Sequence, residues 1–446
     1  MPWVKSNLVC LVATIALQTQ TAEAQGDPLG VDEMAEAIVA MTSPVWTGPR
    51  TAAPARAARP TGASLAIRSP YALLAVHADD EVSERRARET LRALERARAR
   101  LDALGWPSIS SDGGLGGGPE VDLYITDALG AGAHSDGLTP WSYLDRASTF
   151  AVLNPNTPSS RLDACVTAAY AEALLMSADP AEARAWRRAT AAWLAWELTG
   201  SFGCADSVTR QQAEPHRSWV GGAADGGAGG ALWLAHLSAR HDYAAGQFVR
   251  DVWGLARQRT WEGTELRADP DLWSAIETAV EQSGDRLLDN VEELAVLRWF
   301  VGRGANGNTA LASIDSDAMV PVTRRMARLP SKVVAREPLQ AFGSTYIVMD
   351  RAAWNDARTL RAWLRGEYGA RWSFVAVQFD AQGVELRRIS APHTETTPRA
   401  YLPVELDARA AQLLFVVTNL SNALPDADEA DVYHRSFELI VDRAED

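Results

Sequence analysis

The sequence predicts an α+β protein, in which a small mixed sheet and a block of helices precede a C-terminal antiparallel β-sandwich. Three observations support this prediction. Alternating apolar segments flank a long amphipathic helix between residues 71 and 155. From about 161 to 302, Trp and Leu recur at the three- and four-residue spacing of buried helices. From about 320 onward, short alternating segments follow one another between turns, as in a sandwich.

The first 24 residues have the pattern of a secretory signal peptide. Lys5 precedes an apolar run from Leu8 to Leu17, and "AEA" stands just before Gln25 as a cleavage site. The run is too short to span a bilayer, and no later segment is long and apolar enough to do so. We therefore expect export to the periplasm or the cell exterior, without a transmembrane segment. The abundance of Ala and Arg is typical of a GC-rich bacterial genome.

Residues 25–65 are rich in Ala, Pro, Gly and Arg and predict a loosely ordered leader. One short helix is expected within it, at 32–41. The first folded domain is predicted over 66–310. Its sheet part should contain strands at 71–78, 121–129 and 149–155, with a helix at 81–104.

The helical block is predicted to open with a helix pair between Cys165 and Gly200. Further helices are expected at 231–241, 244–258, 270–284 and 288–302. A loop near 303–320 separates this block from the β-sandwich domain at 320–446. Within the sandwich, strands are expected in the segments 340–350, 371–380, 383–390, 411–420 and 433–442.

Charge and cysteine content restrict the functional classes. The net charge of −14 argues against a nucleic-acid partner, because neutralising phosphates requires clustered Lys and Arg. Beyond the signal peptide only Cys165 and Cys204 remain. An even pair in an exported protein predicts a disulfide, although two buried thiols are the alternative.

The common catalytic motifs are missing from the sequence. It contains no HExxH, no Walker A motif and no G-x-S-x-G. His236 and His241 are five residues apart, so on a helix they lie about 140° apart and cannot hold one metal ion together. His134 falls in a glycine-rich segment after a strand, which predicts a loop. We expect no metal and no cofactor.

The order of elements nevertheless resembles a family of secreted bacterial, gluzincin-like metallopeptidases. The segment "VDLYITDALGAGAHSDG" resembles the strand and glycine loop of that family, and "STFAVLNP" resembles its edge strand. "VTAAYAEAL" is similar to the zinc helix with its A-H-E-x-x-H-A motif, and "WRRATAAWLAWEL" to the E-G-T-A-x-W helix of the third ligand. "GGALWLAHLSARH" resembles a later helix. The resemblance covers roughly residues 70–302 and implies a zincin-like first domain.

The resemblance fails at each position that would bind zinc or act as the general base. The first zinc histidine corresponds to Ala168, the general-base glutamate to Ala169, and the second histidine to Glu172. The glutamate of the third ligand corresponds to Arg188, although Thr190, Ala191 and Trp193 are retained. Ala offers no ligand atom and Arg stays protonated, whereas a catalytic zinc takes three protein ligands. The resemblance therefore implies a degenerate member without peptidase chemistry.

Glu172 and Arg188 occupy the places of two ligands that would meet at one metal. We hypothesise that they form an ion pair which cross-links the two helices as zinc would. The alternative is that both side chains are solvated at the surface. Removing one partner of a buried pair would cost roughly 3–5 kcal/mol.

The sequence thus favours a secreted, catalytically inactive metallopeptidase-like protein that binds or scaffolds an unknown protein or cell-surface ligand. One alternative is a hydrolase with a non-HExxH site, for which Glu182, Glu197 and His216 are the candidates. Another is a structural surface protein without any link to peptidases. Trp363 and two other tryptophans of the sandwich could bind carbohydrate, but core positions are the better prediction for them.

Overall fold

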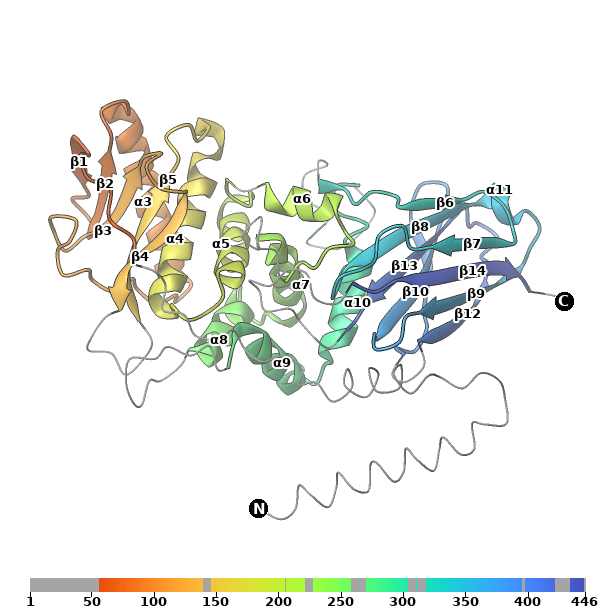
Figure 1. Cartoon of the computed structure of the whole chain (residues 1–446). Helices are drawn as coiled ribbons and strands as arrows, with labels where there is room; N and C mark the ends of the chain where they lie inside the picture. Colours follow the sequence, from red (N-terminus) through yellow and green to blue (C-terminus); the bar gives the residue numbers. More distant parts are fainter. Residues whose placement is uncertain are drawn as a thin grey trace, which may run out of the picture. The chain divides into compact units, whose positions relative to one another are not determined.

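The structure, a computed structural model, has the mixed α+β architecture that the sequence predicts (Figure 1). It describes residues 56–138, 146–204, 206–220, 228–257, 270–303, 311, 318–394, 398–421 and 434–444, all of which belong to one unit, 44–446. The predicted signal peptide and the helix expected at 32–41 lie outside these residues. No helix within the described ranges is long and apolar enough to cross a membrane.

The first sheet is mixed and has five strands in the order β1-β2-β3-β5-β4. The strands are β1 (Leu65–Arg68), β2 (Leu74–Ala78), β3 (Val121–Ile125), β4 (Gly132–Leu138) and β5 (Ala147–Leu153). The three central strands β2, β3 and β5 are parallel, while β1 and β4 pair antiparallel at the two edges. The strands predicted at 71–78, 121–129 and 149–155 correspond to β2, β3 and β5.

The prediction that "STFAVLNP" forms the edge strand of this sheet is wrong. The segment "STFAVLNP" forms β5, which pairs with β3 on one side and β4 on the other. The edge is β4, within the segment expected to be a glycine loop, and His134 lies in this strand. The sequence GAHSDGL has two glycines and few apolar residues, and its register shifts between Ser135 and Gly137. Such a bulged edge strand gives a weak sequence signal.

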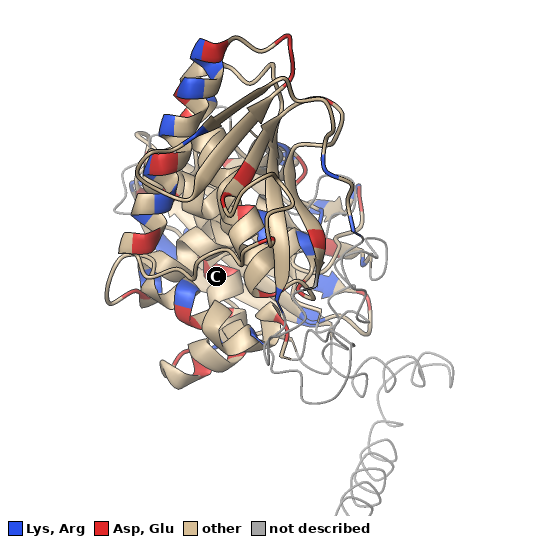
Figure 2. Cartoon of the chain, turned by 90° about the vertical axis from the view of Figure 1, so that its left-hand side faces the viewer, with Lys and Arg blue, Asp and Glu red and all other residues tan. Residues whose placement is uncertain are grey.

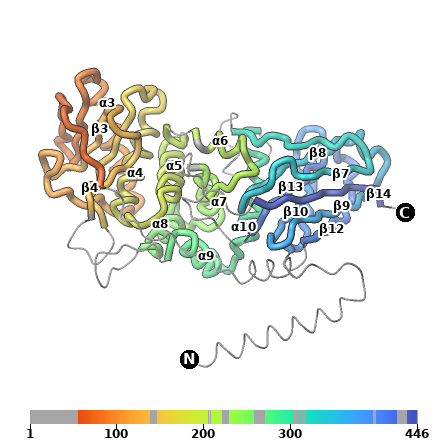
Figure 3. The backbone as a smooth tube through the Cα atoms, in the orientation of Figure 1, coloured from red at the N-terminus to blue at the C-terminus, as the bar shows by residue number. Residues whose placement is uncertain are grey.

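Two helices cover one face of this sheet. Helix α3 (Glu84–Ala103) starts at Ser83, whose side chain accepts a hydrogen bond from the backbone of Arg86. Helix α4 (Leu162–Ala178) packs against α3, β4 and β5, and nearly all of its side chains are buried. Figure 3 shows α4 beside β4. A helix that is apolar on every side belongs in a core.

The opposite face of the sheet is covered by part of the predicted leader. Ala57 packs on Tyr124 and Phe150, and its backbone bonds to Ser135 in β4. Arg59 forms ion pairs with Asp122, with Asp112 at 2.6 Å and with Asp136 at 2.6 Å. The described end of the leader, from residue 56, is therefore held on the sheet and is not loosely ordered.

The predicted helical block follows. It contains α4, α5 (Arg184–Thr199), α6 (Ser207–Ala213), α7 (Ala231–His241), α8 (Gln247–Ala256), α9 (Leu272–Gln282) and α10 (Leu287–Leu297). Helix α5 ends at Gly200, whose φ of +76° is the left-handed conformation that closes many helices. Four stacked or tilted tryptophans fill the centre of the block: Trp186, Trp219, Trp233 and Trp273. Apart from the partly buried Trp196, the tryptophans of the block that the structure describes are core residues, as expected.

The C-terminal region contains two sheets that share one apolar core. The first has the order β11-β10-β13-β8-β6, with β6 (Arg324–Met326), β8 (Ser344–Asp350), β10 (Trp372–Phe379), β11 (Glu385–Ser390) and β13 (Gln412–Asn419). The second has the order β12-β9-β14-β7, with β7 (Ser331–Val334), β9 (Thr359–Gly366), β12 (Arg399–Glu405) and β14 (Phe437–Arg443). A short helix, α11 (Arg351–Trp354), follows β8. All pairings are antiparallel except that β6 runs parallel to β8.

The first of these two sheets is buried on both faces at its central strands, β8, β10 and β13. Its other face packs on the helical block, through residues such as Tyr346, Val375 and Val416. The Tyr346 hydroxyl donates a hydrogen bond of 2.7 Å to the carbonyl of Ala295 in α10. The apolar core of the helical block therefore continues across the boundary predicted at 303–320.

Charged residues are mixed over the surface of the sheet-and-helix end of the molecule. Acidic and basic positions are interspersed there, and neither sign forms a continuous face (Figure 2). Several of the pairs on α3 are helical neighbours, such as Arg88 with Glu84.

We predict that Arg59 stabilises the sheet strongly. Replacing Arg59 with Met would leave three buried aspartates without their cation, and we expect a loss of about 3–5 kcal/mol in the free energy of unfolding. Urea denaturation followed by circular dichroism measures this loss. The matched control is Arg68→Met, because Arg68 pairs with Glu120 at 3.0 Å but is about half exposed and should contribute roughly 0–1 kcal/mol. Equal losses for the two variants would contradict the prediction.

Candidate functional site

A cavity of about 250 Å³ lies between the start of β4, helix α4 and helix α5. All four positions that correspond to the zinc-site residues of the resembled family line it: Ala168, Ala169, Glu172 and Arg188. Ala168 and Glu172 are four residues apart and therefore lie on the same face of α4. The structure thus brings together the residues that the sequence comparison had paired.

The charged groups of Glu172 and Arg188 are in contact. Arg188 Nε donates to Glu172 Oε1 at 3.3 Å, and Arg188 Nη2 donates to the carbonyl of Ala131 at 3.4 Å. The Glu172 side chain is 7% exposed and that of Arg188 25% exposed. The pair therefore joins α4 to α5 and also reaches the beginning of β4. This contact contradicts the alternative in which both side chains are solvated at the surface.

Gly132 makes room for the carboxylate. A Cβ atom at this position would lie 2.6 Å from Glu172 Oε2, and its φ of +121° is in any case unfavourable for other residues. A glycine at the start of β4 therefore lets the edge strand approach the ion pair closely. No feature of the sequence alone identified Gly132 as part of the site.

The predicted disulfide between Cys165 and Cys204 is present, with a Cα–Cα distance of 4.8 Å. Both cysteines line the same cavity. One lies in the first turn of α4 and the other follows α5, at a sequence separation of 39. In the chain-entropy model a loop of this length stabilises the fold by roughly 4 kcal/mol. The bond and the ion pair connect the same helix pair at two places.

A second arginine, which sequence reasoning missed, lies behind the ion pair. Arg187 is buried and donates to the carbonyls of Pro180, at 3.3 Å, and of Glu182. Burial lowers the pKa of Arg187, while the nearby carboxylate of Glu172 raises it. Glu172 therefore contacts the guanidinium of Arg188 and interacts electrostatically with that of Arg187. Consecutive arginines in "WRRAT" were a visible signal, but their burial could not be read from the sequence.

Glu182, one of the candidates for a different catalytic site, is completely buried. Its two carboxylate oxygens accept hydrogen bonds from the backbone of Ala183, at 2.8 Å, and of Leu272, at 2.7 Å. Burial, together with Asp179 and Asp271, raises its pKa well above the usual range. The carboxylate is used to fix the start of α9 and lines none of the cavities described here.

The three candidate residues of that alternative site are not brought together. Glu197 is exposed near the end of α5, and partial desolvation of its carboxyl raises its pKa. His216 contacts Glu337 at 3.1 Å, and burial lowers its pKa. Among the described residues no hydrogen bond or ion pair joins Glu182, Glu197 and His216. The arrangement therefore gives no support to a catalytic group built from these three.

His134, His236 and His241, which the sequence analysis considered, have structural surroundings. His134 stacks on Phe150 and bonds to the carbonyl of Gly130 at 2.7 Å. His236 is buried in α7, and burial lowers its pKa to about 4, so it is neutral at physiological pH. His241 lies at the end of the same helix beside Asn290. Over the described ranges, no three or more His, Cys, Asp or Glu side chains are arranged to hold a metal ion.

Comparisons with known proteins do not assign the chain to a family. No protein-family model matches the sequence, and no curated protein matches it. The chemistry of the site must therefore be argued from its own residues.

We predict that the contribution of the ion pair is asymmetric. Arg188→Ala would remove the ion-pair partner of the buried Glu172 carboxylate and leave it only the electrostatic interaction with Arg187. This change should cost about 3 kcal/mol of unfolding free energy. Glu172→Ala should cost less, because Arg188 can turn toward solvent. The double variant should cost less than the sum of the two single variants, since the pair interacts. Urea denaturation of the oxidised protein measures all three.

The control is the exposed ion pair between Arg96 on α3 and Asp163 on α4, in which each side chain is about half exposed. Arg96→Ala should change the unfolding free energy by about 1 kcal/mol or less. Strictly additive losses at Glu172 and Arg188, or losses no larger than that of Arg96→Ala, would show that the pair does not join the helices.

We also predict a pH dependence that originates at Asp271. This residue caps α9, and burial raises its pKa to about 6, whereas in the unfolded chain it is near 3.9. Between these values the folded state binds more protons, so this residue's contribution is complete below about pH 4 and is lost as pH rises through about 6. Asp271→Asn keeps the cap and removes the titration. Unfolding free energies between pH 4 and 7 should therefore decline less in the variant, by roughly 2–3 kcal/mol, and parallel curves would refute this origin.

Proposed function

We propose that this chain is a secreted, peptidase-like protein without peptidase chemistry, which acts by binding or scaffolding. The observation that carries the proposal is the cavity between β4, α4 and α5. Its positions 168, 169, 172 and 188 hold two alanines and an ion pair in place of a metal site. The partner that we propose is a protein or a cell-surface ligand.

The arrangement of the elements supports a zincin-like first domain. An antiparallel edge strand, β4, lies beside the buried helix α4, and α5 packs against α4. The order differs from the expected one at one place, because the edge strand β4 comes before β5, in the segment expected to be a glycine loop. The two C-terminal sheets that share one core support a β-sandwich as the second domain. Their boundary near 303–320 is part of this proposal.

The residues of the cavity do not fit a catalytic zinc ion. Ala168 and Ala169 carry no ligand atom or base, and a guanidinium cannot coordinate a metal. Glu172 is the single carboxylate there, and it already accepts a hydrogen bond from Arg188. A catalytic zinc requires three protein ligands and an open position. No step of peptide hydrolysis is therefore derived from this site.

Restoring the ligands tests the proposal. A variant with Ala168→His, Ala169→Glu, Glu172→His and Arg188→Glu would carry an HExxH motif and the third ligand of the family. If the cavity keeps the geometry of a zinc site, this variant should bind about one zinc ion per chain after dialysis. Elemental analysis measures the metal, and the wild-type chain should retain none.

A matched control has the same three changes on α4 but Arg188→Leu, which removes the third ligand and should weaken zinc binding. Circular dichroism and a thiol assay confirm that each variant is folded and disulfide-bonded. A folded four-residue variant that binds no zinc would contradict the family resemblance. Stoichiometric zinc in the wild-type chain together with casein hydrolysis would contradict the absence of peptidase chemistry.

A further inference from the structure

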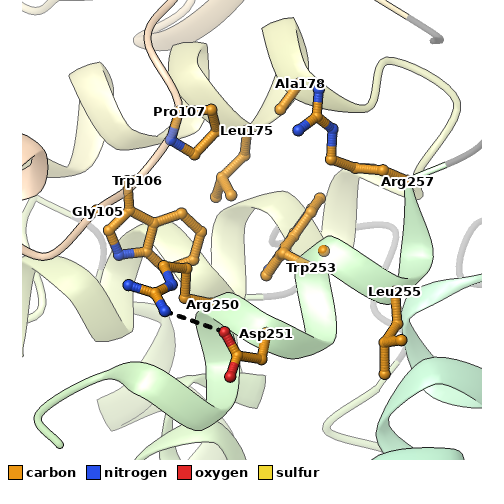
Figure 4. A pocket seen from close by; sticks show the side chains of 11 residues that line it. Gly105, Trp106, Pro107, Leu175, Ala178, Arg250, Asp251, Trp253, Leu255 and Arg257 are labelled. Carbon is orange, nitrogen blue, oxygen red and sulfur yellow. Dashed lines mark hydrogen bonds and ion pairs between the residues drawn. The ribbon is translucent and has the colours of Figure 1, made fainter.

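A different cavity, of about 380 Å³, lies along the last turn of α4. Its walls come from three places: the loop after α3 with Trp106 and Pro107, the end of α4 with Leu175, and helix α8 with Trp253 (Figure 4). None of its lining residues belongs to the cavity around Glu172. Its size is at the lower end of the range of small-molecule sites.

The walls of this cavity are apolar and well fixed. Trp106 is 5% exposed and Trp253 is 3% exposed. The indole nitrogen of Trp253 donates a hydrogen bond of 3.0 Å to Thr190 in α5, which holds the ring in place. Two indole rings, a leucine and a proline therefore form a preformed surface that suits a flat apolar body.

One arginine at the cavity, Arg250, already interacts with other groups of the same chain. Arg250 donates to the carbonyl of Leu104 at 2.8 Å and pairs with Asp251 at 3.2 Å. Asp251 in turn accepts hydrogen bonds from Tyr243, at 2.9 Å, and from Gln247, at 2.7 Å. The charges of Arg250 and Asp251 therefore compensate each other.

The other arginine has no such partner among the residues that the structure describes. Nε and Nη2 of Arg257 are buried, and no described residue accepts a hydrogen bond from either atom or forms an ion pair with this side chain. Burial lowers its pKa, the charge of Arg146 lowers it further, and Asp179 opposes this effect. Figure 4 places Arg257 beside Ala178, apart from the pair of Arg250 and Asp251. Buried donors without acceptors are costly, and an anion that enters the cavity and meets this guanidinium after a small rotation of the side chain would relieve that cost.

We propose that this cavity binds a small amphipathic carboxylate, with its apolar ring or chain between Trp106 and Trp253 and its carboxylate on Arg257. Two arginines and one aspartate leave one positive charge in the lining, which matches a monoanion. A guanidinium can bind a carboxylate with two parallel hydrogen bonds. This proposal is independent of the peptidase resemblance and holds whether or not that resemblance is correct.

The test compares two probes of the same shape on the full, oxidised chain. Calorimetric titration with 2-naphthoate should show one site, and the neutral 2-naphthamide should bind at least about 10-fold more weakly, because it lacks the charge that Arg257 requires. Arg257→Met should weaken 2-naphthoate binding by roughly 10–100-fold and leave 2-naphthamide nearly unchanged. The control Arg286→Met, at a highly exposed arginine, should alter neither.

A second variant fills the cavity without disturbing the fold. A Cβ atom added at Gly254 of α8 meets no other atom within 4 Å, and replacing a helical glycine also favours the helix. Gly254→Leu should therefore keep or raise the melting temperature while removing the binding of both probes. Three results would each overturn the proposal: no binding of 2-naphthoate at about millimolar concentration, equal affinity for the amide, or unchanged binding in Gly254→Leu.

Discussion

The complete burial of α4 is the constraint on which the first part of the structure depends. This helix lies against α3, α5 and two strands at once, so its side chains must be small or apolar. Its many alanines let the neighbours approach closely, and they leave little room for a charge that is not matched nearby. Glu172 is the charged residue that is buried in it. Arg188 forms an ion pair with that carboxylate, Arg187 interacts with it electrostatically, and Gly132 leaves room for it.

An ion pair and a metal ion would connect α4 and α5 in physically different ways. A zinc ion fixes its ligands in a tetrahedral geometry and leaves one position open for chemistry. In the ion pair, Arg188 donates hydrogen bonds to the Glu172 carboxylate and to the carbonyl of Ala131. It supplies no activated water and no open position. The disulfide beside it restrains the same helices covalently, so the geometry of the helix pair does not depend on a metal.

The sequence predicted the elements whose patterns are uniform and missed those whose patterns are mixed. Strand β10 is buried on both faces, and its segment was recognised as one of the short, mostly apolar strands between turns. Strands β9 and β12 expose every second residue, and arginines such as Arg361 and Arg365 concealed their alternation. Strand β4 was hidden by its two glycines and its bulge. The site positions followed from the resemblance alone. The burial of Arg187, and the lack of a described partner for Nε and Nη2 of Arg257, depend on contacts between distant segments and leave no local signal.

The double burial of the sheet that contains β8, β10 and β13 has a practical consequence. One face of this sheet completes the core between the two C-terminal sheets, and the other completes the core of the helical block. A chain shortened near residue 320 would expose the apolar surface around Val320 and α10, and the isolated C-terminal part would expose Tyr346 and its neighbours. Exposed patches of this kind promote aggregation. The two parts therefore share a buried apolar interface that neither can cover alone, and they are best produced and studied together.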